Sequence, residues 1–296
     1  MELTFLGTSS MVPTKDRNHS SVLLEYKAEG ILIDCGEGTQ RQLRMIGIKP
    51  NKITKILISH WHGDHVLGLI GLIQSLGACE YSGNLKIYGP EGTIENFEHL
   101  KKAFVFEDKI EFEVNEVKKR VFVDTEDFFI EALPLEHGMP CLGYNFVEKD
   151  RLRIKLPAAH ALGIPEGPLL GKLQSGKPIV FKGKKINPED VTYVVKGKKV
   201  SFISDTCLTQ NCVELARDAD LLVCEATYAD DLEEKAEAYL HLTARQAGMI
   251  ANQAGVKKLV LTHFSQRYKN TQIIEENART VFDNVVCAKD FMKIVP

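Results

Sequence analysis

The chain has 296 residues, of which 44% are hydrophobic and 26% are charged, and its formal net charge is −3. This composition is typical of a globular protein with one large domain or two small ones, and the charge alone does not predict a nucleic-acid partner. No apolar run approaches the roughly 20 residues that cross a bilayer, and no secretory signal pattern is visible. We therefore expect no membrane partner and a cytoplasmic location. Seven cysteines without a CxxC pair favour reduced thiols.

The first half of the chain predicts short strands separated by turns. Apolar runs bounded by Gly, Pro, Asn or Lys predict strands at residues 3–6, 21–25, 31–34, 56–59 and 85–88. Helical spacing of apolar residues predicts a helix over 66–76 and another that begins at Thr93 and extends toward 106. β-Branched and aromatic residues from 109 to 147 predict antiparallel strands.

The segment 149–199 has a different composition. It contains twelve Lys and Arg residues against four Asp and Glu residues, a local charge of +8, so the remainder carries −11. Prolines and glycines are interspersed between 157 and 190. We predict a protruding basic arm that is inserted into a single domain spanning 1–296 and serves an anionic partner, with a solvated loop as the alternative.

The last third returns to an alternation of strands and helices. Strands are predicted at 200–203, 221–224 and 259–261, and helices at 243–254 and 273–282.

The most informative segment is 59–65, Ser-His-Trp-His-Gly-Asp-His, which follows the apolar run 56–58. His60 and His62 alternate along an extended chain and can face the same side, whereas Gly63 opens a tight turn for the carboxylate and the third imidazole. These groups suit zinc, and four of them can serve two metals, which favours hydrolysis of phosphate or acyl bonds. The alternative is a polar turn with incidental histidines.

Further candidate ligands and acid–base groups share one position, shortly after an apolar strand. They are His137, Asp205, Glu225 and His263. Because functional residues of α/β folds gather at strand ends, we expect one site to which both halves of the chain contribute. Three of these residues could instead have a purely structural role. His137 could occupy a turn, Asp205 could cap a helix near Thr209, and Glu225 could be a carboxylate at the edge of the core.

Together these residues resemble the metallo-β-lactamase superfamily, whose mark is the His-x-His-x-Asp-His turn found here at 60–65. The resemblance implies an α/β fold, a four-layer αβ/βα sandwich with a binuclear metal site between two sheets. Four further segments are similar to the ribonuclease Z family, which trims 3′ trailers from tRNA precursors. They are Pro13–Asn18 (Pro-x-Lys-x-Arg-Asn loop), Glu225–Thr227 (His-Glu-Ala-Thr motif, with Cys224 at the His position), His241–Thr243 (His-Ser-Thr motif, with Leu242 at the Ser position) and Gly167–Gly176 (Gly/Pro-containing hand of the tRNA-binding arm).

The resemblance implies two zinc ions per subunit. The expected ligands are His60, His62 and His137 for one ion, Asp64, His65 and His263 for the other, and Asp205 as a bridge. It implies an endoribonuclease that leaves a 3′-hydroxyl on the tRNA and a 5′-phosphate on the trailer. Asp64 would accept a proton from water, and His241, oriented by Glu225, would be the general acid. From the sequence alone, His241 could instead simply precede a helix capped by Thr243.

The resemblance also implies a precursor tRNA as partner and a homodimer in which one subunit's arm serves the other's site. The residues expected to contact RNA are Lys15, Arg17 and Asn18 in the first loop and Gly167, Pro168, Lys172 and Lys177 in the arm. The loop residues would sense the 3′ end, although they could be ordinary surface charges. The arm residues would bind the tRNA elbow through its shape and its phosphates.

Two other functions remain open. A metallo-β-lactamase-fold phosphodiesterase that acts on a small molecule would leave the basic arm unexplained. A metal-stabilised RNA-binding protein without catalysis would be expected to lose ligands, whereas this chain keeps all seven candidates together with His241.

Overall fold

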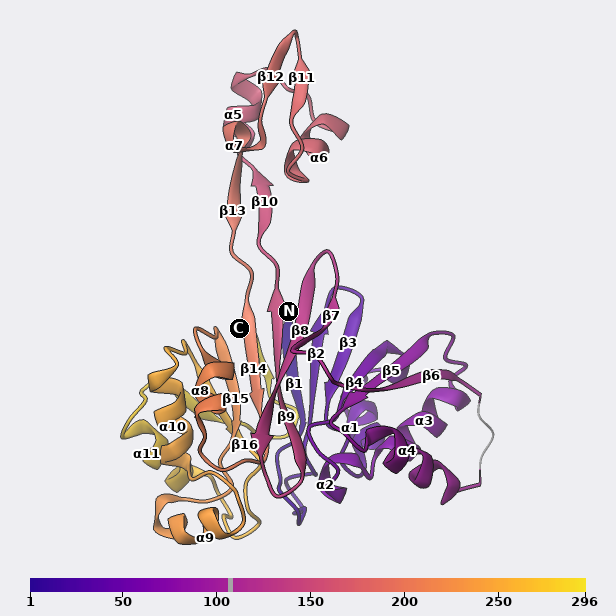
Figure 1. The fold of residues 1–296 in the computed structure, drawn as a ribbon, viewed down its shortest axis with the longest axis vertical. Helices are drawn as coiled ribbons and strands as arrows, with labels where there is room; N and C mark the ends of the chain where they lie inside the picture. The colour runs from indigo at the N-terminus through magenta and orange to yellow at the C-terminus, as the bar shows by residue number, and fades with distance from the viewer. Residues whose placement is uncertain (106–108) are drawn as a thin grey trace. The chain divides into compact units, whose positions relative to one another are not determined.

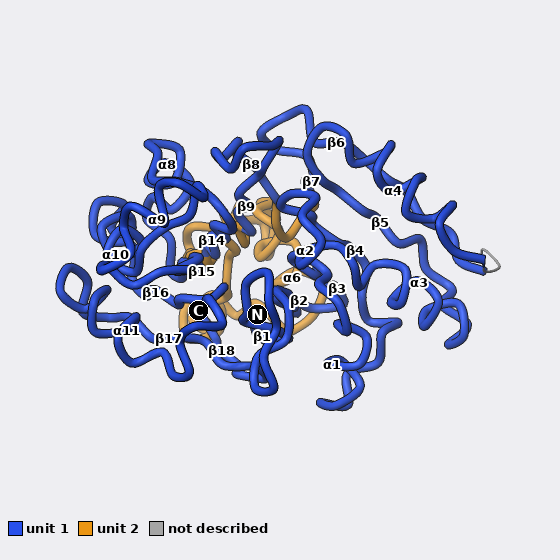
Figure 2. Tube along the Cα trace, turned by 90° about the horizontal axis from the view of Figure 1, so that it is seen from below, with its two compact units in different colours: residues 1–124, 130–146, 199–296 blue, residues 125–129, 147–198 orange. Residues whose placement is uncertain are grey.

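The computed structural model describes residues 1–105 and 109–296 (Figure 1). The backbone divides into two compact units, coloured separately in Figure 2. Unit 1 comprises residues 1–124, 130–146 and 199–296, and unit 2 comprises residues 125–129 and 147–198. Each unit has a hydrophobic core of its own. Of the helices described, none combines the length and the apolar character required to cross a membrane.

Unit 1 is built on two seven-stranded sheets. The first sheet has the order β18-β1-β2-β3-β4-β5-β6, with β1 (Glu2–Gly7), β2 (Ser21–Tyr26), β3 (Glu29–Ile33), β4 (Ile53–Leu57), β5 (Asn84–Gly89), β6 (Glu111–Glu116) and β18 (Lys293–Ile294). The second has the order β17-β16-β15-β14-β9-β8-β7, with β7 (Val121–Asp124), β8 (Phe128–Glu136), β9 (Pro140–Glu148), β14 (Lys199–Ile203), β15 (Leu221–Glu225), β16 (Leu259–Thr262) and β17 (Val285–Cys287). All the individually predicted strands are therefore present, with ends shifted by a few residues.

Helices cover the outer face of each sheet (Figure 1). The first sheet carries α1 (Thr39–Met45), α3 (Leu69–Ala78) and α4 (Thr93–Lys102), and the second carries α8 (Gln210–Ala216), α10 (Ala244–Gln253) and α11 (Gln272–Arg279). Shorter helical turns are η1 (Pro50–Lys52), α2 (Gly63–Val66), η2 (Asp230–Leu232) and α9 (Glu233–Ala238). Between the sheets, the rings of Tyr26 and Phe146 pack edge to face with centroids 5.2 Å apart. This layering is the predicted αβ/βα sandwich.

The helix predicted from Thr93 is α4, which ends at Lys102, and residue 106 lies outside the described residues. The prediction of antiparallel strands throughout 109–147 is wrong for β6, which pairs in parallel with β5. Parallel neighbours require a crossover connection, and α4 provides it.

The helix predicted over 66–76 is interrupted at Gly68, because α2 ends at Val66 and α3 begins at Leu69. The Gly68 amide donates to the carbonyl oxygen of Cys35 (2.9 Å). A Cβ atom at position 68 would lie 2.0 Å from the carbonyl oxygen of Gly36. The close approach of the backbone at Gly68 to that of Cys35 and Gly36 therefore separates the histidine turn from α3. This contact is not visible in the local pattern of apolar residues.

Unit 2 has a small, separate architecture. Two antiparallel pairs, β10 (Arg151–Ile154) with β13 (Thr192–Val195) and β11 (Ile179–Phe181) with β12 (Lys184–Ile186), accompany the helices α5 (Leu156–Ala161), α6 (Pro168–Gln174) and α7 (Pro188–Val191). Its core consists of seven buried apolar residues: Ala159, Ile164, Leu170, Leu173, Ile179, Ile186 and Val191. The lysines of the 172–185 stretch remain exposed around this core.

We predict that Gly68→Ala destabilises the protein by about 3 kcal/mol or more, because its new methyl group would overlap the backbone of Gly36. Gly171→Ala is the matched control, since position 171 lies in α6 with nothing within 4 Å of a Cβ atom. It should be neutral or stabilise by up to about 1 kcal/mol. Urea unfolding of both variants measures the difference, and equal stabilities would contradict the close-approach argument.

Candidate metal centre

The buried carboxylate of Asp34, at the end of β3, organises the histidine turn. It accepts hydrogen bonds from the backbone N (2.7 Å) and Oγ (2.8 Å) of Ser59 and from Nδ1 of His65 (2.8 Å). Because Nδ1 of His65 is engaged in this way, Nε2 is the nitrogen that faces the other candidate ligands. Asp34 is not among the predicted site residues, although it too ends an apolar strand, which is the signal that identified the others.

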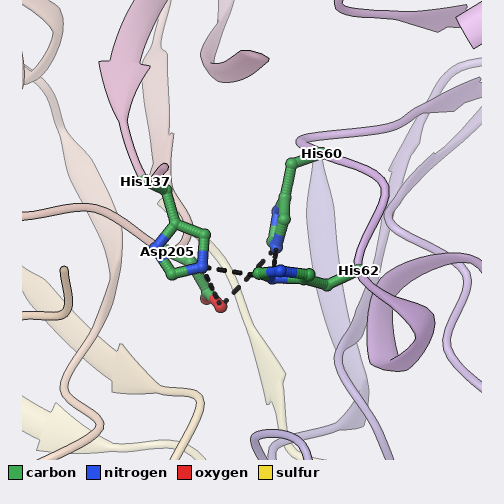
Figure 3. A group of neighbouring side chains, drawn as sticks. All are labelled: His60, His62, His137 and Asp205. Carbon is green, nitrogen blue, oxygen red and sulfur yellow. Dashed lines mark hydrogen bonds and ion pairs between the residues drawn. The ribbon is translucent and has the colours of Figure 1, made fainter. Parts of the chain in front are cut away.

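A first group of ligand-type side chains converges from both sheets (Figure 3). It consists of His60, His62, His137 and Asp205, whose ligand atoms all lie within 4.8 Å of one another. Nδ1 of His62 is 3.0 Å from Nε2 of His60 and 3.2 Å from Nε2 of His137. Oδ2 of Asp205 is 3.7 Å from the same nitrogen of His60 and 3.6 Å from that of His137.

A second group shares Asp205 with the first. Its members are Asp64, His65, Asp205 and His263, all buried. Nε2 of His65 lies 3.3 Å from Oδ2 of Asp64 and 3.5 Å from Oδ2 of Asp205. Nε2 of His263 lies 3.4 Å from Oδ2 of Asp64 and 3.2 Å from Oδ1 of Asp205. The structure thus brings all seven predicted ligands together.

The chemistry of these donors fits metal ions. Burial, reinforced by His65, lowers the pKa of His60 well below its ordinary value, so this imidazole is neutral. Although burial favours the protonated acid, His263 and His65 hold the pKa of Asp205 well below its usual range. Within the described residues, Nε2 of His65 and Oδ1 of Asp205 are buried without a hydrogen bond. The neutral imidazole of His60, packed near an ionised carboxylate that has an unsatisfied oxygen, is a suitable ligand set for a divalent cation.

Three of the imidazoles are also held by a hydrogen bond at the ring nitrogen that faces away from the group. The contacts are His60 Nδ1 with Ser59 Oγ (3.0 Å), His137 Nδ1 with the carbonyl oxygen of Leu240 (2.8 Å) and His263 Nδ1 with Thr227 Oγ1 (2.9 Å). Such outer contacts fix the ring orientation and the tautomer of a metal ligand. Thr227 belongs to the segment Glu225–Thr227 that resembles a family motif, but the sequence alone predicts no role for it. Its hydroxyl also donates to Glu225 (2.6 Å).

His241 and Glu225 form a pair at the edge of the second group. Nδ1 of His241 lies 3.1 Å from Oε1 of Glu225, which also accepts from the backbone N of Thr206 (2.9 Å). Although burial opposes the charged imidazole, Glu225 and then Asp205 raise the pKa of His241 to about 9. A group with that pKa carries a proton at neutral pH, as a proton donor must. Thr243 does cap α10 with a capping box, so His241 both precedes a helix and contacts Glu225.

The purely structural roles considered for Asp205 and Glu225 do not apply in this structure. Asp205 does not cap a helix, because α8 has Thr209 at its N-cap. Glu225 is fully buried and hydrogen-bonded, rather than lying at the edge of the core. Cys224 and Leu242, which stand where the family motifs have polar residues, are fully buried in the core of the second sheet.

Comparison with known proteins identifies the family. A family model described as "Anti-Pycsar protein Apyc1" matches residues 1–150, and one described as "Beta-lactamase superfamily domain" matches residues 172–264. The ribonuclease Z of Methanothermobacter thermautotrophicus is 44% identical over 99% of this chain and 96% of its own length. The chain belongs to the ribonuclease Z family. Ribonuclease Z from Methanosarcina acetivorans is 40% identical, and that from Thermobifida fusca 42%, each over 99% of this chain and more than nine-tenths of its own.

Solved structures agree with membership of the ribonuclease Z family. The short form of human tRNase Z has a TM-score of 0.73 and 30% identity, covering 100% of this chain and 99% of its own. YhfI from Bacillus subtilis, a metallo-β-lactamase fold protein, has a TM-score of 0.72 over 99% of this chain and 98% of its own, at 19% identity. These similarities confirm the predicted metallo-β-lactamase fold.

The loop at 13–18, which resembles a motif of the ribonuclease Z family, is tied to the chain's own backbone. Nη2 of Arg17 donates to the carbonyl oxygen of Tyr268 (2.7 Å), and Nδ2 of Asn18 donates to a backbone carbonyl (2.8 Å). The side chain of Lys15 is 90% exposed and is therefore the one most accessible to RNA. A role for this loop in binding RNA stays a prediction.

The other residues predicted to contact RNA lie in unit 2. Gly167, with a φ of 125°, immediately precedes α6, which begins at Pro168. Lys172 on α6 and Lys177 after it are both exposed. These four residues therefore belong to a different unit from the candidate metal ligands, and the function of unit 2 stays a prediction.

We predict that Asp34→Asn lowers metal affinity about 10- to 100-fold. The new amide would donate toward Nδ1 of His65, which would leave the proton on Nε2, and a protonated nitrogen cannot bind a metal. The metal content after dialysis against graded chelator measures this. Asp290→Asn, at a half-buried carboxylate outside the ligand groups, should retain metal. Wild-type affinity in Asp34→Asn would contradict the argument.

Proposed function

We propose that this chain is a zinc-dependent endoribonuclease that removes the 3′ trailer of tRNA precursors, leaving a 3′-hydroxyl on the tRNA and a 5′-phosphate on the trailer. The observation that carries the proposal is its near-full-length similarity to ribonucleases Z, at up to 44% identity among the relatives described above. The convergence of seven ligand-type side chains beside the His241–Glu225 pair supports the same conclusion. No observation favours the alternative, a phosphodiesterase for a small molecule.

In this proposal the two ligand groups hold two zinc ions per subunit. His60, His62 and His137 would bind one ion, Asp64, His65 and His263 the other, and Asp205 would bridge them. Histidine and carboxylate are ligands that zinc accepts, and the outer hydrogen bonds on the imidazoles support this assignment. Two such ions would supply a water of lowered pKa as nucleophile and positive charge beside the phosphoryl oxygens.

The chain's own residues would move the protons. Although burial opposes ionisation, contacts with His263 and His65 hold the pKa of Asp64 well below its ordinary value. Asp64 is thus ionised, as a ligand or as an acceptor of a proton from water must be. The Nδ1 atom of His241 is occupied by Glu225, so Nε2 would donate the proton to the leaving 3′-oxygen. Glu225 would orient this imidazole and stabilise its charge.

Unit 2 would be the tRNA-binding arm, within the segment 149–199 inserted into a single metallo-β-lactamase-type domain. The twelve basic residues of the segment 149–199, against four acidic ones, would favour phosphate contacts, and Gly167, Pro168, Lys172 and Lys177 would belong to the binding surface. The loop residues Lys15, Arg17 and Asn18 would act at the 3′ end. We further propose a homodimer and a cytoplasmic location, both on the basis of the family.

Cleavage of a precursor tRNA with a 3′ trailer tests the proposed function, with the product end mapped to the nucleotide. The wild-type protein should make a single zinc-dependent cut that leaves a 3′-hydroxyl. Asp205→Ala should lose both the bound metal and all measurable cleavage, because it removes the carboxylate shared by the two ligand groups. No cut by the metal-loaded wild-type protein would contradict the proposed function, and full activity of Asp205→Ala would contradict the bridging role.

His241→Gln tests the proton donor. We expect cleavage of the precursor to fall by about 10²- to 10⁴-fold with the metals retained. Hydrolysis of bis(p-nitrophenyl) phosphate should hardly change, because p-nitrophenolate leaves without a proton. His99→Gln, at an exposed histidine on α4, is the control and should behave as wild type. An equal loss on both substrates would indicate that His241 maintains the metal site instead.

The double variant Lys172→Gln/Lys177→Gln tests the arm. Loss of two phosphate contacts should reduce the slope of log affinity for tRNA against log salt by about 2. Hydrolysis of bis(p-nitrophenyl) phosphate should be unchanged. The matched control is Lys118→Gln/Lys119→Gln, which removes the same charge from exposed positions of unit 1. The same slope in both double variants would refute a specific role for unit 2.

A further inference from the structure

Beside His241 lies a cluster of two cations and two aromatic rings that the proposed mechanism does not use. Its members, the cation–aromatic cluster, are Tyr228, Lys235, Tyr239 and Arg267. The ring centroids of Tyr228 and His241 are 6.0 Å apart. Cζ of Arg267 lies 5.4 Å from the Tyr228 centroid, and Nζ of Lys235 lies 6.0 Å from it. Lys235 also lies 5.7 Å from the centroid of Tyr239.

Both cations of the cluster are available to a ligand. Neither Lys235 nor Arg267 forms an ion pair with any carboxylate in the described part of the chain, the glutamates of α9 included. Nε of Arg267 donates to Ser265 Oγ (3.2 Å), which orients the guanidinium and leaves its terminal nitrogens free to bind an anion. Two cations that contact the same ring and have no carboxylate partner are suited to a phosphate.

The two rings differ in exposure and therefore in what they can do. Tyr228 is 8% exposed, so its ring packs against Lys235, Arg267 and the imidazole of His241 and is not available for stacking on a base. Tyr239 is 60% exposed and offers a large aromatic surface to solvent. An exposed ring next to unpaired cations is the combination with which proteins bind single-stranded nucleotides, by stacking on the base and pairing with the phosphate.

The position of the cluster specifies which nucleotide it would meet. Each member follows or precedes a residue of the Glu225–His241–His263 group closely along the chain, so the same backbone positions both. In an in-line displacement the leaving oxygen departs on the side opposite the attacking water. If His241 protonates that oxygen, the nucleotide that bears it lies on the His241 side of the scissile phosphorus.

We propose that the cation–aromatic cluster binds the last nucleotide of the mature tRNA, the one that keeps the 3′-hydroxyl. Tyr239 stacks on its base, and Lys235 and Arg267 bind the phosphate on its 5′ side. The cluster holds the ribose so that its 3′-oxygen faces Nε2 of His241. This inference rests on the proposed function and deepens it, because it assigns residues that position the cut.

A cycle that combines a protein variant with a substrate variant tests the stacking contact. Wild-type protein and Tyr239→Ala each cleave a normal precursor and one in which the last tRNA nucleotide is abasic. Removal of the ring or of the base alone should lower kcat/KM by about 10- to 100-fold, and removal of both should cost little more. Tyr239→Phe retains the ring and should restore wild-type activity. Hydrolysis of bis(p-nitrophenyl) phosphate should be the same in all three proteins, which verifies folding and metal binding.

The outcomes separate this inference from the proposed function. If the wild-type protein cuts the normal precursor but the two losses multiply, the ring does not contact that base and the inference is wrong. Wild-type kcat/KM in Tyr239→Ala would also overturn it. If the wild-type protein does not cut the precursor at all, the proposed function fails and the inference fails with it.

Discussion

The site depends on the carboxylate of Asp205, because this residue belongs to both groups of ligand-type side chains. It follows β14 in the second sheet, whereas His60 and His65 come from the turn after β4 in the first. The two groups can share it only because the sheets pack face to face, with contacts such as that of Tyr144 Oη with the carbonyl oxygen of Ile58 (2.7 Å). The fold thus serves the site by aligning the ends of strands from two sheets.

Around this shared carboxylate, residues outside the two ligand groups also hold the candidate ligands in place. Asp34 and Thr227 hold His65 and His263 by their outer nitrogens. Asp34 and His263 both have left-handed backbone conformations, with φ of 57° and 60°. Such conformations cost on the order of 1–3 kcal/mol each and persist where function requires them. The site is therefore preorganised by strain and hydrogen bonds, which is what a precise arrangement of metal ligands needs.

Much of the fold and of the candidate site could be predicted from local sequence, because several runs of apolar residues are followed directly by a His, Asp or Glu side chain. That pattern, with the resemblance it supports, led to the strands, the fold and the seven residues that converge. What it missed depends on tertiary contact: the break at Gly68 reflects a backbone 32 residues away, and β6 is parallel to β5 because α4 intervenes. Asp34 joins the site only through partners more than 20 residues distant. Likewise, the sequence predicts an RNA contact for Arg17, with an ordinary surface charge as the alternative, but does not show that its side chain donates to the backbone of Tyr268.

The most direct test of the central claim, a two-metal centre bridged by Asp205, is anomalous diffraction from a crystal of the zinc-loaded protein. The account predicts two anomalous peaks about 3.5–4 Å apart, one among His60, His62 and His137 and the other among Asp64, His65 and His263. One carboxylate oxygen of Asp205 should lie within about 2.2 Å of each peak or be shared by both. A single peak, or two peaks of which Asp205 touches only one, would contradict it.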